Sequence, residues 1–387
     1  MRFYLRMVKR PFWLNLVEQQ WSRRSILWLR GVRRAGKTCL AKSLPGVEYF
    51  DCELPRVRRA MEDPEAFLAG LRRQRVVLDE VHRLPNPSEL LKIAADHFPD
   101  IRVLATGSST LGASVRFRDT LAGRKADVWL TPMIEADLKP FSNADLPHRL
   151  LHGGLPPFFL SPEPPERDFQ EWMDAYWAKD IQELFRLERR ASFQRFVELL
   201  MAQSGGLFEA TRFAAPCEVS RSTIQNYLAV LEATSVAIVV RPFSSRRSHE
   251  IIAAPKVYGF DTGFVCAHRG WTELRREDLG RLWEHFVLNE LLARTQSSVV
   301  RYWRDKQGHE VDFVFAPRRG QVLALECKWS AKDFDPAGLR AFARNYPKAR
   351  LLVVAADARP AFKREYAGQR VEFVGLNEAI STLAGKD

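Results

Sequence analysis

The sequence predicts an α/β fold that is divided between more than one domain. Two observations support this prediction. Short apolar runs of strand length alternate with stretches of helical periodicity in both the N-terminal and the C-terminal part of the chain, and a proline-rich segment followed by mainly helical sequence separates these parts. The length of 387 residues agrees, because it suggests roughly two to three domains.

The N-terminal part is expected to form a helix and a parallel sheet. Residues 1–24 are basic and aromatic, and charges interrupt each apolar run, so they predict an amphipathic helix and not a secretory signal. Apolar runs at 25–29, 76–78 and 101–105 predict three strands, each followed by helical sequence. Short buried strands that alternate with helices are typical of a parallel sheet with both faces covered.

The rest of the chain divides into a connector and a second α/β region. Prolines crowd residues 146–165, where they break helices and predict a connection between domains. We therefore expect domains at 1–145, 146–256 and 257–387. The further predicted elements are helices at 168–185, 193–203, 279–293 and 338–345, and strands at 236–240, 299–303, 310–315, 322–326 and 351–355.

The chain is strongly basic, which favours negatively charged partners. The formal net charge is +12, and residues 1–40 contain ten Lys or Arg but one acid, Glu18. A basic surface attracts nucleic acid by neutralising phosphates, and it can equally dock an acidic protein or keep a protein in solution. A nucleic acid such as DNA and an acidic protein therefore both stay open as partners.

Cysteine usage and hydropathy favour a cytoplasmic protein. The five cysteines stand singly, without the spacing of a zinc site or the density of a disulfide framework. No apolar stretch approaches the roughly 18 residues that a membrane helix requires. We therefore expect no membrane segment and a reducing, cytoplasmic environment.

The octapeptide GVRRAGKT (Gly31–Thr38) matches the phosphate-binding pattern G-x-x-x-x-G-K-[ST] between a predicted strand and a predicted helix. Gly31 and Gly36 let the backbone bend so that successive amides face the phosphates of ATP, and the following helix directs its positive end at the same anion. Lys37 is expected to contact the β- and γ-phosphates, and Thr38 to offer its hydroxyl to Mg²⁺. The alternative, a structural glycine-rich turn, is disfavoured by the strand context and by a second motif.

The second motif is an apolar strand that ends in two acids, Asp79 and Glu80. Asp79 would hold the Mg²⁺ shell, and Glu80 would orient or deprotonate the attacking water. Ser108 follows the next strand, where its hydroxyl would either lie near the γ-phosphate or cap a helix. Arg124 would stabilise phosphate charge, either within the chain or across a subunit boundary in a homo-oligomer.

Taken in order, the strings GVRRAGKT, VVLDEVHRLP, LATGSST and LAGR resemble a family of prokaryotic AAA-type ATP-binding proteins, and LHGGLPPFF and YWAKDI extend the resemblance. It spans nearly the whole chain. It implies a P-loop AAA-type ATPase domain, a helical connector with a winged-helix module, and a C-terminal domain of unknown function with a restriction-endonuclease-like core. Val32 and Cys39 replace the proline and threonine that are common in that family, and neither position supplies an essential side chain. The residues expected around the nucleotide are Gly31, Val32, Arg33, Arg34, Ala35, Gly36, Lys37, Thr38, Cys39 and Ser108.

The connector contains a candidate DNA-binding helix. Residues 219–233 predict a turn and a helix whose apolar positions Ile224, Leu228 and Leu231 share one face, which resembles the second helix of a helix-turn-helix. The strand at 236–240 would begin a wing. The wing tip would carry Arg241, Arg246 and Arg247, and the helix would offer DNA its side chains Arg221, Ser222, Thr223, Gln225 and Asn226. The alternative is a packing or protein-docking module, which the lack of a fixed base-reading set favours.

Acidic residues in the C-terminal part resemble the short PD-(D/E)XK nuclease pattern. Glu284 lies on a predicted helix, Asp312 on a strand, and Glu326 and Lys328 on the next strand, where alternation puts both on one face. In that chemistry Asp312 and Glu326 would bind Mg²⁺, Glu284 would assist, and Lys328 would orient or activate water. The alternative is a salt-bridge cluster or an abandoned active site in a domain that only binds.

The sequence thus predicts a Mg²⁺-dependent ATP-binding protein and ATPase, with Lys37, Glu80 and Arg124 as catalytic residues and Thr38 and Asp79 as metal ligands. We expect its nucleotide cycle to control a nuclease-like C-terminal interaction domain. The alternative is an ATP-dependent nucleic-acid enzyme. Its metal-dependent nuclease site would consist of Glu284, Asp312, Glu326 and Lys328.

Overall fold

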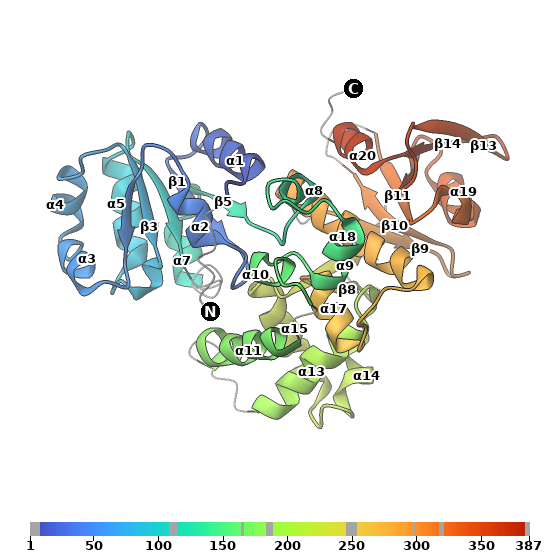
Figure 1. Ribbon diagram of the computed structural model, residues 1–387, viewed down its shortest axis with the longest axis horizontal. Helices are drawn as coiled ribbons and strands as arrows, with labels where there is room; N and C mark the ends of the chain where they lie inside the picture. Colours follow the sequence, from blue (N-terminus) through green and yellow to red (C-terminus); the bar gives the residue numbers. More distant parts are fainter. Residues whose placement is uncertain are drawn as a thin grey trace. The chain divides into compact units, whose positions relative to one another are not determined.

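The structure of the chain is a computed structural model (Figure 1) that describes residues 8–107, 115–163, 166–182, 189–244, 254–297, 299–316 and 321–383. The chain divides into two compact units. The first unit comprises Met1–Asp145, Gly154–Arg190 and Ala229–Val236, and the second comprises Leu146–Gly153, Ala191–Leu228 and Ala237–Asp387. The division into three domains at residues 145 and 256 stays a prediction.

The first unit contains a five-stranded sheet in the order β2-β3-β4-β1-β5, in which every pair of neighbours is parallel. The prediction of a parallel sheet is therefore confirmed. Its strands are β1 (Ile26–Arg30), β2 (Glu48–Asp51), β3 (Arg75–Asp79), β4 (Arg102–Thr106) and β5 (Lys125–Trp129). The two unpredicted strands, β2 and β5, lie at the edges of the sheet and carry charged residues, so neither forms an apolar run.

Both faces of this sheet are covered, as predicted. Successive residues of β1, such as Leu27 and Trp28, point to opposite faces, yet both are buried. Figure 1 shows helices beside this sheet, among them α1 and α5. The helices of the unit are α1 (Pro11–Trp21), α2 (Lys37–Lys42), α3 (Pro55–Ala60), α4 (Pro64–Ala69), η1 (Val81–Arg83), α5 (Pro87–His97), α7 (Val115–Thr120), α8 (Glu135–Leu138), α10 (Pro156–Phe159), α11 (Glu166–Tyr176) and the π-helical turn η2 (Trp177–Ile181).

We expected the proline-rich stretch to break helices, but its described residues contain two short helices. These are α10 and, in the second unit, α9 (Leu146–His152). Proline fits the first turn of a helix, where its missing N–H would have no partner within the helix. Helix α10 accordingly begins with Pro156, and Pro147 is the second residue of α9.

The second unit contains a mixed nine-stranded sheet in the order β13-β14-β12-β11-β10-β9-β7-β8-β6. Its strands are β6 (Gly206–Leu207), β7 (Ala237–Pro242), β8 (Lys256–Gly259), β9 (Arg301–Arg304), β10 (Glu310–Phe315), β11 (Leu323–Lys328), β12 (Arg350–Ala355), β13 (Phe362–Tyr366) and β14 (Gln369–Val374). Strand β7 pairs with β8 antiparallel and with β9 parallel, so the strand predicted at 236–240 belongs to the large sheet.

The remaining helices are α13 (Arg190–Ala202), α14 (Ala210–Ala214), α15 (Arg221–Ala233), α17 (Thr262–His268), α18 (Arg276–Thr295), η3 (Ala331–Asp333), α19 (Ala337–Asn345) and α20 (Leu376–Leu383). Of these, α13, α15, α18 and α19 lie close to the predicted ranges, whereas α14, α17, η3 and α20 were not predicted. In α15 the buried positions include Ile224, Tyr227 and Leu231, whereas the predicted Leu228 is half-buried. Among the helices of the described residues, none has the length and apolar character needed to cross a membrane.

Helix α18 buries a histidine that its neighbours keep uncharged. The ring of His285 contacts Tyr258 of β8, with 5.7 Å between the ring centroids. Burial lowers the pKa of His285 to about 4, because the charged imidazole would lose its hydration.

We expect the free energy of unfolding to decrease as the pH falls from 6.5 to about 4, because the unfolded chain takes up a proton there that the folded His285 does not. The contribution is fully present above the unfolded pKa and is lost as the pH falls through the folded one. It amounts to about 3 kcal/mol. Urea unfolding across this range should show a weaker pH dependence in His285→Gln, and an unchanged one in the exposed control His97→Gln. Equal pH dependence in wild type and His285→Gln would contradict the assignment.

Candidate functional site

The loop between β1 and α2 has a backbone that requires glycine at two positions. A Cβ at residue 31 would lie 2.4 Å from the carbonyl oxygen of Leu130, which is closer than real Cβ contacts. Gly36 has a φ of +97°, in the left-handed region that side chains disfavour. The two glycines of the pattern G-x-x-x-x-G thus lie where a side chain would clash, at residue 31, and where it would strain the backbone, at residue 36.

The side chain of Lys37 folds back over this loop. Its Nζ donates to the carbonyl oxygens of Gly31 at 2.8 Å and Val32 at 3.1 Å. Burial lowers the pKa of Lys37, and attraction to Glu80 and Asp180 opposes that shift. The loop therefore holds a cation that is only partly neutralised by carbonyl dipoles, which suits an anionic ligand.

The two acids at the end of β3 have different surroundings. Asp79 is buried and accepts hydrogen bonds from Tyr49 Oη at 2.6 Å and from Thr106 Oγ1. Glu80 adopts a left-handed backbone conformation, and one of its carboxylate oxygens lies 3.1 Å from His82 Nδ1. The hydrogen bond with His82 lowers the pKa of Glu80, although burial opposes this. Glu80 is thus held as a carboxylate.

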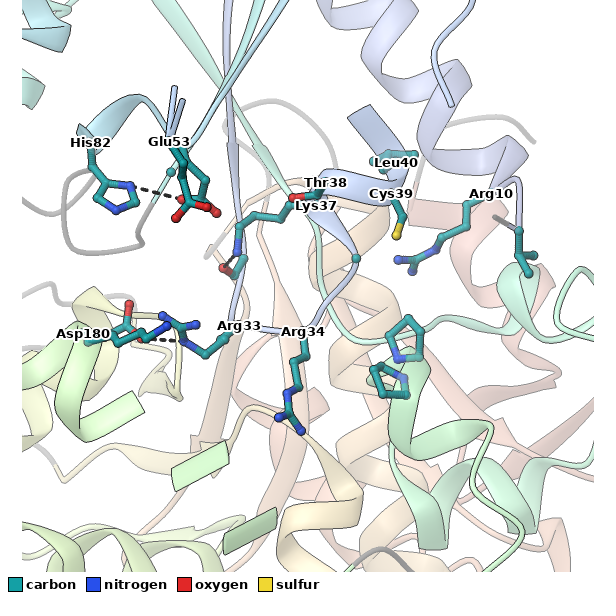
Figure 2. Close-up of a pocket in the computed structure, with 18 of the residues that line it drawn as sticks. Arg10, Arg33, Arg34, Lys37, Thr38, Cys39, Leu40, Glu53, His82 and Asp180 are labelled. Atoms are coloured by element: carbon teal, nitrogen blue, oxygen red, sulfur yellow. Dashed lines mark hydrogen bonds and ion pairs between the residues drawn. The ribbon is translucent and has the colours of Figure 1, made fainter. Parts of the chain in front are cut away.

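The loop and Glu80 line one pocket of about 400 Å³ (Figure 2). Of the residues expected around the nucleotide, seven line it: Gly31, Arg33, Arg34, Gly36, Lys37, Thr38 and Cys39. Val32 and Ala35 are buried and do not, and Ser108 lies outside the described residues. The predicted metal ligand Thr38 lines the pocket, whereas Asp79, the buried last residue of β3, does not.

Arg124 lies elsewhere in the first unit. Its guanidinium forms two hydrogen bonds with the carboxylate of Asp96, at 2.7 and 3.0 Å, and it does not line the nucleotide pocket. This position does not support a role for Arg124 at the phosphates within its own chain, because its guanidinium is paired with Asp96 outside the pocket. A role across a subunit boundary stays a prediction.

Sequence reasoning missed a set of side chains that reach the same pocket from distant segments. Asp180, in the turn η2, lies 3.1 Å from the Nε of Arg33 (Figure 2). The backbone of Arg33 is held as well, because its carbonyl oxygen accepts a hydrogen bond from Trp172 Nε1 at 2.9 Å. Arg10 and His82 also line the pocket. Asp180 belongs to the string YWAKDI, which contributed to the family resemblance without a role. A π-helical turn in such a place often marks a functional site.

Comparison with known proteins bears directly on this pocket. Residues 23–138 match a family model described as an AAA domain. Residues 143–275 and 279–375 match two models described as domains of unknown function, DUF8612 and DUF4143. The first match supports an AAA-type ATP-binding protein. The restriction-endonuclease-like core and the winged helix are left as proposals.

Longer similarities extend over most of the chain. It is 29% identical over 346 residues to the uncharacterized protein Rv2008c of Mycobacterium tuberculosis, with 86% of this chain and 76% of that protein covered. The same values hold for the uncharacterized protein Mb2031c of Mycobacterium bovis. A solved structure, the Walker-type ATPase PABY2304 of Pyrococcus abyssi, is matched over 68% of this chain and 96% of that chain, at 16% identity and a TM-score of 0.43. A likeness at this TM-score supports no further conclusion.

The four residues that resemble the nuclease pattern lie within one cluster of the second unit. They are Glu284, Asp312, Glu326 and Lys328. Lys328 Nζ is 2.8 Å from Glu326 Oε1, and Asp312 accepts a hydrogen bond from the backbone N–H of Cys327 at 2.8 Å. Burial raises the pKa of Asp312, and repulsion from Glu284 and Glu326 adds to the shift.

Sequence reasoning missed the centre of this cluster, Lys256 of β8, whose Nζ lies 3.2 Å from Glu284 Oε1. Throughout the described part of the chain, no group of three or more His, Cys, Asp or Glu side chains is arranged to hold a metal ion.

Proposed function

We propose that the chain binds ATP with Mg²⁺ in the pocket of the first unit, hydrolyses it, and uses this cycle to control its C-terminal region. One observation carries the proposal: the glycine-dependent loop, Lys37, Thr38 and the carboxylate of Glu80 line a single pocket. Its volume of about 400 Å³ is within the range of small-molecule sites. The AAA-domain match over residues 23–138 supports the same ligand class.

The residues present suit a magnesium ion that arrives with the nucleotide. Mg²⁺ is usually held by one or two carboxylates together with substrate phosphates, and not by a full protein cage. The hydroxyl of Thr38, which lines the pocket, would hold the ion, and the carboxylate of Asp79, which does not line it, would hold the outer shell of the ion. When bound, Mg²⁺ would neutralise charge on the phosphate oxygens.

Each protein group then has a defined task. Lys37 would exchange its carbonyl partners in the loop for the β- and γ-phosphates. Glu80, which His82 holds as a carboxylate, would orient the attacking water and accept its proton. Arg33 would supply the positive charge at the phosphates that the sequence had suggested for Arg124, because its guanidinium is near the pocket and Asp180 fixes its direction.

Phosphate release from Mg²⁺-ATP tests the proposed activity. Lys37→Ala should abolish turnover because the phosphates lose their main cation. Glu80→Gln should retain ATP binding but lower kcat by about 10²- to 10⁴-fold, the usual contribution of a general base. Lys92→Ala, an exposed lysine of α5, serves as the control and should behave as wild type. Full turnover in purified Lys37→Ala would disprove the assignment of the site.

Asp180→Asn tests the positioning of Arg33. Loss of the carboxylate charge leaves the guanidinium free to change direction, so kcat should fall by roughly tenfold to a hundredfold with little change in KM. The matched control is Asp174→Asn, which removes an exposed ion pair with Arg190 of the same region. An increase in kcat would show instead that Asp180 holds Arg33 away from the phosphates.

For the C-terminal region we propose interaction and not cleavage. In the connector before it, the succession of α13, α14 and α15 followed by the antiparallel strands β7 and β8 supports a winged-helix module. Of the predicted wing tip, Arg246 and Arg247 lie outside the described residues. One observation supports the nuclease alternative. The carboxylates of Glu284 and Glu326 lie close enough to Asp312 for their charges to raise its pKa.

Cleavage assays separate the two readings. With Mg²⁺, and with or without ATP, the wild-type chain should leave single-stranded DNA, double-stranded DNA and RNA intact. The control is Asp312→Ala, which should give the same result. Cleavage by wild type that disappears in Asp312→Ala would favour the nuclease alternative, whatever the ATPase assay shows.

A further inference from the structure

We propose that the ammonium group of Lys256 occupies the cation position of the C-terminal carboxylate cluster, so that a cation of the chain itself takes the place of Mg²⁺ there. The cluster consists of Glu284, Glu310, Asp312 and Glu326. The inference concerns the second unit alone and does not depend on the proposed ATPase activity.

The position of Lys256 carries the argument. Its Nζ lies 2.5 Å from Glu310 Oε1, 3.2 Å from Glu284 Oε1 and 3.8 Å from Asp312 Oδ1. These three carboxylates come from β10 and α18, whereas the lysine comes from β8. An ammonium has three N–H donors, so carboxylates on several sides can be satisfied by one group.

Burial makes this arrangement a replacement for a metal and not a surface ion pair. The side chain of Lys256 is only 5% exposed, and its Nζ lies 5.8 Å from the centre of the Tyr302 ring. Carboxylates removed from water need a cation or a proton. Here the cation belongs to the chain itself.

The remaining groups offset more of the negative charge of the cluster. Glu326 is paired with Lys328 at 2.8 Å, Arg304 lies 3.5 Å from Glu310, and Tyr258 Oη donates a hydrogen bond to Glu284. Four carboxylates thus face two buried or half-buried lysines and one more exposed arginine.

The residues do not suit Mg²⁺ while Lys256 is in place. Magnesium requires oxygen ligands at roughly 2.0–2.1 Å in near-octahedral geometry. The ammonium already contacts the same carboxylate oxygens, and it would repel a second cation at that point. In the described part of the chain, no set of three or more His, Cys, Asp or Glu side chains is arranged to hold a metal ion, which agrees with this.

The inference predicts that a divalent cation binds only after the lysine is removed. Mn²⁺ alone, without nucleotide, is titrated into the full-length protein, and free Mn²⁺ is followed by electron paramagnetic resonance. Lys256→Gln should bind Mn²⁺ at least about tenfold more tightly than wild type, a gain of the size that metal sites lose with a supporting residue. Adding Asp312→Asn to Lys256→Gln should remove the gain.

A control variant locates the effect. Lys332→Gln removes an exposed lysine of the same unit and leaves the cluster intact, so its Mn²⁺ affinity should equal that of wild type. The loop of the first unit is identical in all variants, so its contribution cancels.

Two results would overturn the inference. One is a folded Lys256→Gln, checked by circular dichroism, that binds Mn²⁺ no better than wild type. The other is Mn²⁺ binding by wild type that Asp312→Asn abolishes. If Lys256→Gln does not fold, the comparison of wild type with Asp312→Asn decides alone: wild-type binding that depends on Asp312 refutes the inference, and its absence upholds it.

Discussion

The pocket of the first unit, which we propose binds ATP, depends on one buried ion pair between Arg10 and Asp137. Arg10 Nε and Nη2 donate to the two carboxylate oxygens, at 2.9 and 2.6 Å, and Nη1 donates to the carbonyl oxygen of Ala35 at 3.0 Å. Asp137 also accepts from Trp13 Nε1 at 3.1 Å. A single arginine thus joins the start of α1, the phosphate loop and the turn into α8. Because both charges are excluded from water, each needs the other, and the geometry of the loop follows from their pairing.

The pocket of the first unit and the carboxylate cluster of the second unit differ in how their charges are paired. In the first unit Lys37 is paired with carbonyl dipoles, and Arg33 with a single carboxylate, so the pocket can accept a phosphate chain. In the second unit Lys256 and Lys328 already contact the carboxylates and offset part of their charge, so the need for an external cation is smaller. A carboxylate cluster that contains its own cation has less need of a bound ion than a cluster without one.

Much of the fold followed from local pattern. The strands β1, β3 and β4 are short apolar runs, and β10 has the bounds that alternation predicts. Strand β13 could not be found in this way, because FKREY is mostly charged and largely exposed. Its place comes from antiparallel pairing with β14, and pairing with a neighbour overrides the weak preference of the strand itself.

The sequence by itself determined the phosphate loop, because two glycines, a lysine and a threonine act within eight consecutive residues and their spacing is their geometry. Only the tertiary structure decided which charges meet. Asp180 reaches Arg33 across 147 positions, and Arg10 reaches Asp137 across 127. Lys256 of β8 lies in the acidic cluster, and the residues next to it in the sequence do not indicate this contact. A charged side chain finds its partner through the path of the backbone in space, and no local period encodes that path.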